Sequence, residues 1–193
     1  GDGCMMEGVA SEAASLAGHL KLDELVVFYD DNSITIEGQT SLAFSENVAA
    51  RFTAYGWRVI TLADANDPAL CDAALAEAQN TDGRPTLIIG KTQIGFGAPN
   101  KQGKSSAHGE PLGVEEVEAL RRNLGMPEGE FQVLPEVTEF LHSRVEELVA
   151  EAAAWDKKFQ AFLDADQSRA KQIDAYLNRT VPADIKEQLL AAV

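Results

Sequence analysis

Two oxygen-bearing side chains in the first part of the chain, Asp2 and Asn32, are of the types that bind a divalent cation. The segment between them has room for one helix and one hydrophobic strand, so both residues can return to the same edge of a parallel sheet. A carboxylate and an amide oxygen can share a hard cation there, with a backbone carbonyl just beyond Asn32 as a third ligand. Mg²⁺ prefers such a site, in which phosphate and water supply the remaining ligands.

Glycines on both sides of Asp2 indicate that the cation is bound together with a phosphate. Gly1 and Gly3 allow the backbone to approach a phosphate closely, and the N-terminus of a following helix favours negative charge. The tripeptide GDG alone is weak evidence. A GDG that is followed by a helix and by a hydrophobic strand ending in DDNSI is far more specific.

The elements that must position these residues alternate along the first part of the chain. Helices are expected over residues 7–20, over 46–55 and from Pro68, and strands over 25–29, 57–62 and 85–90. Ser45 and Asp67 have the right type and position to cap the second and third helices. This alternation predicts an α/β fold with a parallel sheet flanked by helices.

Hydrophobic periodicity predicts which side chains of these elements are buried. The apolar run from Leu25 to Tyr29 suits a strand that is buried on both faces. The inner face of the first helix is expected to carry Val9, Ala13, Leu16, Ala17 and Leu20. We expect Trp57, Phe96 and Trp155 in the core, and we expect His19 and His142 to be structural or surface residues. We expect solvated helix faces, and not acid–base pairs, at Glu115–Glu116 and Glu146–Glu147.

The second half of the chain has a different character. Residues 94–113 are rich in glycine and lack periodicity, and long loops in compact domains are often functional. Helices are expected over 114–123, 136–164, 167–179 and 183–193. We therefore predict an α/β domain over residues 1–125, and a helical extension over residues 126–193 that leads towards a following domain.

Several segments of the chain are similar to transketolases, which are thiamine-diphosphate enzymes. The matching segments are GDGCMMEG, LAGHLKLDELVVFYDDNSITIEG, RFTAYGW and KTQIGFGAPNKQGKSSAHGEPLG. The resemblance runs from Gly1 to about Gly125, and the remainder fits more loosely. It implies the thiamine-diphosphate-binding fold, and it places this chain in the N-terminal diphosphate-binding domain, the first of three in that family.

The resemblance implies a set of site residues. Asp2, Asn32 and the main-chain oxygen of Ile34 would bind the cation that bridges the diphosphate, either Mg²⁺ or Ca²⁺. The implied cofactor-binding residues are Gly1, Gly3, Glu7, Asn32, Ile36 and His108. One departure is Asp31, which stands where many thiamine enzymes have a first asparagine.

Three of these residues also have simpler interpretations. Glu7 would join a network at a dimer contact near the active sites, or it would only interact with the helix dipole. Ile36 would contact the rings of the cofactor, or belong to the core, or both. His108 would contact the diphosphate and the substrate and help with proton transfer, because an imidazole titrates near neutral pH. The alternative for a loop histidine is a surface residue.

The implied reaction is transfer of a two-carbon ketol unit from a ketose phosphate to an aldose phosphate, as in the pentose phosphate pathway or the Calvin cycle. The cofactor's thiazolium carbanion would attack the donor carbonyl. The glutamate that activates the cofactor lies in the next domain of the family and matches no residue here. The chain alone should therefore be catalytically incomplete. The alternatives are a sister enzyme (dihydroxyacetone synthase or deoxyxylulose-phosphate synthase) and a non-catalytic diphosphate-binding module.

Charge and cysteine content limit the partners and the compartment. The formal net charge is −15, which disfavours nucleic acid and anionic membranes. Cys4 and Cys71 have no metal-like spacing and fit reduced thiols in the cytoplasm. The strand that should precede Gly1 is missing, so we expect a fragment or one piece of a split protein. The expected partners are sugar phosphates and the remaining transketolase domains, in a homodimer or split-subunit assembly.

Overall fold

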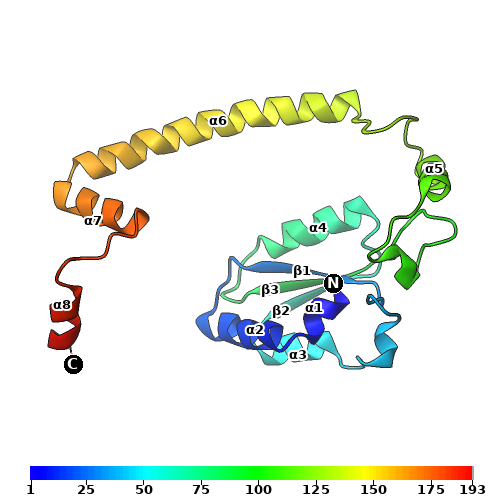
Figure 1. Cartoon of the computed structure of the whole chain (residues 1–193), viewed down its shortest axis with the longest axis horizontal. Helices are drawn as coiled ribbons and strands as arrows, with labels where there is room; N and C mark the ends of the chain where they lie inside the picture. The colour runs from blue at the N-terminus through cyan, green and yellow to red at the C-terminus, as the bar shows by residue number, and fades with distance from the viewer. Residues whose placement is uncertain (193) are drawn as a thin grey trace. The chain divides into compact units, whose positions relative to one another are not determined.

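The computed structural model describes residues 1–192, and its first compact unit, Gly1–Gly129, contains a three-stranded parallel sheet (Figure 1). The strands are β1 (Val26–Asp31), β2 (Arg58–Leu62) and β3 (Thr86–Lys91), in the order β1-β3-β2. Val26 and Arg58 both align with Thr86, so the three strands start and end at the same two edges. The predicted parallel α/β fold is confirmed.

Helices cover both faces of this sheet, and the central strand β3 supplies the core of each face. Its side chains alternate, as the twofold period of a strand requires. Leu87 and Ile89 pack with α2 (Gly8–Leu20) and α3 (Val48–Ala54), whereas Ile88 packs with α4 (Pro68–Ala78). Figure 1 shows α2 and α3 on one side of the sheet and α4 on the other.

The first residues of the chain are more helical than expected. A short helix, α1 (Asp2–Met6), precedes the segment in which the first helix is expected, and extended backbone at Glu7 separates it from α2. On α2 only Ala14 and Ala17 are buried, while Val9, Leu16 and Leu20 are more than half exposed. Ala13 is exposed as well, so only Ala17 of the predicted inner face is buried, and the small side chains of Ala14 and Ala17 join the core.

The close packing of α2 depends on Gly18. A Cβ atom at this position would lie 1.9 Å from the main-chain oxygen of Tyr55, so only glycine fits. Beside it, the indole N–H of Trp57 donates to the Ala14 carbonyl at 2.8 Å. Trp57 is buried as predicted, but Phe96 and Trp155 are exposed, so the core prediction is wrong for both.

Two further expectations about elements need correction. The edge strand β1 pairs only with β3, and Val26 and Phe28 are exposed, so β1 is not buried on both faces in this chain. The cap of α3 is Asn47 instead of Ser45, since the Asn47 side chain accepts from the Ala50 N–H at 2.9 Å. Asp67 caps α4 as predicted, by accepting from Ala69 at 2.8 Å.

Three short elements complete the first unit. They are the 3₁₀ helices η1 (Thr40–Leu42) and η2 (Ser105–Ala107) and the helix α5 (Val114–Asn123). Residues 94–113 contain only η2 and otherwise form the expected long loop.

The second compact unit begins at Glu130 and is helical. It contains α6 (Pro135–Asp164), α7 (Gln167–Leu177) and α8 (Ile185–Ala191). Asp166 caps α7, and the Arg169 guanidinium lies 4.4 Å from the centre of the Phe162 ring, which joins α6 to α7. The described part of these three helices has no buried residue. None of the helices within residues 1–192 combines the length and apolar character that crossing a membrane requires.

Candidate functional site

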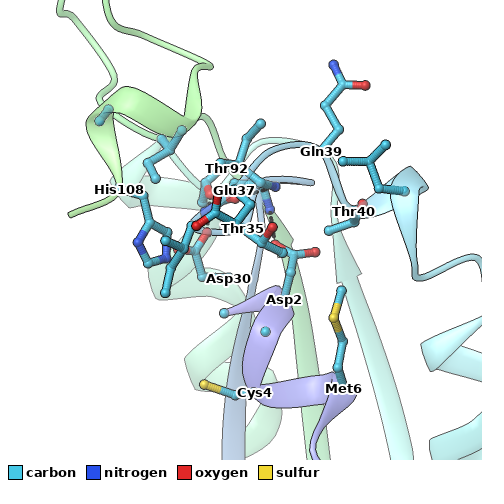
Figure 2. A pocket seen from close by; sticks show the side chains of 18 of the residues that line it. Asp2, Cys4, Met6, Asp30, Thr35, Glu37, Gln39, Thr40, Thr92 and His108 are labelled. Carbon is cyan, nitrogen blue, oxygen red and sulfur yellow. Dashed lines mark hydrogen bonds between the residues drawn. The ribbon is translucent and has the colours of Figure 1, made fainter. Parts of the chain in front are cut away.

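A cavity of about 1040 Å³ lies where the carboxyl ends of β1 and β3 meet the start of α1. Parallel α/β sheets commonly bind ligands at this end. Its wall contains all eight site residues predicted from the sequence, namely Gly1, Asp2, Gly3, Glu7, Asn32, Ile34, Ile36 and His108. Figure 2 shows the side chains around Asp2 and His108.

The Asp2 carboxylate is held rigidly at the base of this cavity. The residue is only 3% exposed, and the Tyr29 hydroxyl donates to Oδ1 at 2.8 Å. The backbone N–H groups of Asn32 and Ser33 each donate to Oδ2 at 3.2 Å. These bonds bring Asp2 and Asn32 together, as the spacing in the sequence predicts.

Tyr29 remains a hydrogen-bond donor over the whole neutral range. Burial is the main cause that raises the pKa of its phenol, and the hydrogen bond to Asp2 and the negative charge of Asp2 raise it further. A protonated phenol can donate its hydrogen bond to Asp2 Oδ1, as it does in this geometry. The hydrogen bond therefore holds the buried Asp2 side chain in place beside β1.

Asn32 is fixed by a network of its own. Its Oδ1 accepts from the Ile34 N–H at 2.9 Å, across Ser33, whose φ of 64° is in the left-handed region. Its Nδ2 donates to Asp30 Oδ2 at 3.2 Å, and Asp30 in turn accepts from the Thr92 hydroxyl. The asparagine side chain therefore has one defined orientation, with its oxygen on the side of Ile34.

The oxygen atoms of Asp2 and Asn32 suit a hard cation that takes only some of its ligands from the protein. A carboxylate has about four lone-pair sites, and the three donors to Asp2 leave one on Oδ1. Within residues 1–192 no group of three or more His, Cys, Asp and Glu side chains could hold a metal. A cation here would need Asn32, a main-chain carbonyl and the ligand's own oxygens, as Mg²⁺ sites do.

The backbone beside Asp2 is open to the cavity. A Cβ atom at Gly3 would meet no other atom within 4 Å, so the backbone there faces open space in the cavity wall. A ligand phosphate can approach such a backbone closely.

The three remaining predicted residues lie on different parts of the cavity wall. Glu7 is exposed at the junction of α1 and α2, and Ile36 is exposed beyond β1. His108 is exposed directly after η2, and its ring points towards the side chains around Asp30 and Thr35 (Figure 2). Ile36 is 69% exposed, so the core interpretation of this residue is not supported in this chain.

Sequence reasoning missed several residues of the cavity. Thr92 and Gln93 follow β3 directly and line the same wall, and Thr35 and Gln39 line it from the segment after β1. The rule that placed Asn32 at the carboxyl end of β1 applies equally to the end of β3, and it would have found Thr92 and Gln93.

Comparisons with known proteins show which family this chain resembles. A family model described as "Transketolase, thiamine diphosphate binding domain" matches residues 1–182. "Transketolase 2" of Vibrio parahaemolyticus is 45% identical over 188 residues, which cover 97% of this chain and 28% of that protein. Among solved structures, the transketolase of Leishmania mexicana matches 94% of this chain and 27% of its own, with a TM-score of 0.86 and 37% identity.

A second solved structure, a transketolase of Pichia stipitis in complex with sedoheptulose-7-phosphate, matches 95% of this chain with a TM-score of 0.84 and 38% identity. The match covers 27% of that chain. The chain thus spans little more than a quarter of the length of the relatives that it matches.

Proposed function

This chain belongs to the transketolase family, and we propose that the cavity at the end of its parallel sheet binds the diphosphate of thiamine diphosphate together with Mg²⁺. The observation that carries this proposal is the gathering of the eight predicted residues on one cavity wall. In particular, a buried carboxylate and an oriented amide lie next to each other. The curated relatives are transketolases, so the sister-enzyme and non-catalytic alternatives are not favoured.

Asp2, Asn32 and the main-chain oxygen of Ile34 are the proposed protein ligands of the cation. Tyr29 and the two backbone N–H groups orient the Asp2 side chain, so it can bind a cation without rearrangement. Gly3 leaves the backbone open to the diphosphate, and Gly1 lines the same wall. A cation with few protein ligands can then use phosphate oxygens and water for the others.

Ile36 and His108 are proposed to act on the rest of the cofactor and on the donor sugar. Ile36 offers an exposed apolar side chain, which suits the face of an aromatic ring. The His108 imidazole can donate to anionic oxygens, and histidine is the side chain that most often serves as a general acid or base. Glu7 is exposed on the same wall and is proposed to join a carboxylate network at a subunit contact.

The reaction proposed for the assembled protein is transfer of a two-carbon unit between sugar phosphates. When bound, thiamine diphosphate supplies the nucleophilic carbon and the electron sink for cleavage of the donor. The residues of this chain position the cofactor, and His108 moves a proton at a donor oxygen. The Pichia stipitis structure with sedoheptulose-7-phosphate supports sugar phosphates as substrates.

The assembly is proposed to include the remaining transketolase domains, as a homodimer or as split subunits. The chain spans 28% of Transketolase 2 of Vibrio parahaemolyticus, so the other parts of the active site are expected from those domains. Ketol transfer by the purified chain alone would contradict this.

Within the chain, we propose residues 1–125 as the diphosphate and metal domain and 126–193 as its helical extension. The free Cys4 and Cys71 fit a reducing cytoplasm.

Calorimetry of the chain with thiamine diphosphate, in Mg²⁺ and in EDTA, tests the proposed function. We expect binding in Mg²⁺ and loss of binding in EDTA. Asp2→Asn keeps the shape of the side chain but removes its charge, and should weaken Mg²⁺-dependent binding at least about tenfold. Glu37→Gln is the matched control, because Glu37 lines the same cavity and is not a proposed ligand. Unchanged affinity and metal dependence in Asp2→Asn would overturn the proposal.

A further inference from the structure

Glu116 is a buried carboxylate that the sequence analysis placed in solvent. It lies in the first turn of α5 and is only 8% exposed, so the predicted solvated pair is wrong for this residue. The N–H groups of Asn100 and Lys101 donate to its Oε1 at 2.7 and 3.1 Å, and the Asn100 side chain donates to Oε2 at 2.9 Å. Both carboxylate oxygens are therefore directed at the loop of residues 94–113.

That loop carries His108 to the cavity, yet its composition does not favour order. It contains five glycines, and Gly95, Gly97 and Gly103 have φ values of 65°, 89° and 73°. Glycine loses more conformational entropy on ordering than any other residue. The only regular structure between Ile94 and Gly113 is the three-residue η2. The conformation of the loop must consequently depend on a few specific contacts.

Some of those contacts are hydrogen bonds within the loop, such as that from the Gly103 N–H to the Ile94 carbonyl at 2.8 Å, and others come from α5. Besides the bonds of Glu116, the Asn123 side chain donates to the Gly97 carbonyl at 2.9 Å. A Cβ atom at Gly97 would lie 2.8 Å from the Leu120 side chain, so this part of the loop packs directly on the helix. The helix α5 thus serves as a platform for the loop.

Glu116 is also linked, through Lys101, to the part of the loop that contains His108. Lys101 donates its backbone N–H to Glu116, and its ammonium group donates to the Pro111 carbonyl at 3.0 Å. This second bond closes the segment from Lys101 to Pro111, with His108 inside it. A carboxylate that fixes Lys101 therefore fixes the base of the closed segment.

The Glu116 side chain is charged, which allows it to accept several hydrogen bonds from the loop. The hydrogen bond from the Asn100 side chain, followed by those from the backbone N–H groups, holds the pKa of the carboxyl group below its usual range. Position in the first turn of a helix further favours a negative side chain. Glu116 is therefore ionised at neutral pH and can accept from all three donors at once.

We propose that Glu116 is a positioning residue, which holds His108 at the cavity through its hydrogen bonds to Asn100 and Lys101. The importance of this positioning for catalysis rests on the proposed function, in which His108 contacts the cofactor and the donor sugar. The placement of the loop does not rest on it. Glu116 itself is not on the cavity wall, so its effect on a ligand must pass through the loop.

The test is NMR of the ligand-free chain, with amide hydrogen exchange and the ring signals of the three histidines as readouts. In Glu116→Ala, amides of residues 97–111 should exchange about tenfold faster or more, because a buried cluster of donors loses its acceptor. The core amides of Leu87 and Ile88 should keep their protection. The ring signals of His108 should shift, while those of His19 and His142 stay in place.

Two further variants separate positioning from charge and from general stability. Glu115→Ala removes the same charge from the same helical turn, and Glu115 accepts no hydrogen bond within residues 1–192, so loop and His108 signals should be unchanged. Asn100→Ala removes one donor and leaves the core untouched. Amide exchange in the same segment should rise by a smaller factor than in Glu116→Ala. This variant can be measured even if Glu116→Ala folds poorly.

Several results would overturn the proposal. One is unchanged loop exchange and an unmoved His108 signal in the Glu116 and Asn100 variants. Another is an equal loss of protection at Leu87 and Ile88, which would give Glu116 only a general role in stability. Because no ligand is present, failure of the chain to bind thiamine diphosphate leaves these readouts intact. It would count against the proposed function alone.

Discussion

Tyr29→Phe removes one hydroxyl group and tests how the Asp2 carboxylate is stabilised. The hydroxyl donates to Asp2 Oδ1 at 2.8 Å, and both residues are 3% exposed. A hydrogen bond to a charged group contributes about 1.5–3 kcal/mol. The ring itself stays in the core, so no large cavity forms. We expect the free energy of unfolding of the first compact unit to fall by about 1.5–3 kcal/mol.

Urea unfolding measured by the fluorescence of Trp57 reports this change, since Trp57 and Tyr29 belong to the same buried cluster. A Trp155→Phe background removes the second tryptophan, which lies in the other unit. Tyr55→Phe is the matched control, because the Tyr55 hydroxyl has no hydrogen-bond partner within residues 1–192, and should change stability by less than about 0.5 kcal/mol. Equal stability of the Tyr29 and Tyr55 variants would refute the reasoning.

The effect of Tyr29→Phe on the free energy of unfolding should also depend on pH in the alkaline range. The pKa of Tyr29 is raised above its ordinary value of 10.0 by burial and by Asp2, so the unfolded chain releases the phenol proton first. The contribution of Tyr29 is fully present below pH 10 and is lost as the pH rises further. The difference in stability between parent and Tyr29→Phe should therefore shrink above pH 10. A constant difference up to the highest accessible pH would count against the buried pair.

Two other substitutions test the packing of α2 and the role of the loop histidine. Gly18→Ala places a methyl group 1.9 Å from the Tyr55 carbonyl oxygen and should cost about 1–3 kcal/mol, whereas Gly8→Ala meets no atom within 4 Å and should stabilise by up to about 1 kcal/mol. Equal urea midpoints for the two variants would contradict the close approach. In the assembled enzyme, His108→Ala should lower kcat and raise the donor KM together, with a loss near 10²-fold, about the lower end for an acid–base group. Steady-state kinetics that match the parent, with a normal thermal melt, would make His108 a surface residue.

The general position of the site could be predicted from the sequence because it depends on a simple rule of topology. Asp2 and Asn32 are separated by one helix and one strand, and the carboxyl ends of parallel strands share one edge. The same rule, applied to β3, would have added Thr92 and Gln93.

Burial was harder to predict, because it depends on neighbours that sequence periodicity does not reveal. Glu116 looked like a solvated residue of a polar helix, and only the aperiodic loop that covers it makes it buried. The large apolar residues Leu16 and Leu20 of α2 are exposed, because Gly18 brings the helix backbone against Tyr55 and leaves room only for small side chains. Loop conformation and helix rotation are both decided by tertiary contacts.

The most direct test of the proposed cofactor site is a crystal structure of the chain grown with thiamine diphosphate and Mn²⁺. Manganese accepts the same oxygen ligands as Mg²⁺, and its anomalous scattering locates the ion. We predict that the anomalous peak marks a manganese ion bound by Asp2, Asn32 and the main-chain oxygen of Ile34. The diphosphate should lie beside Gly3. A peak at another position, or ordered thiamine diphosphate without a cation at Asp2, would contradict the metal-bridged binding proposed for this cavity.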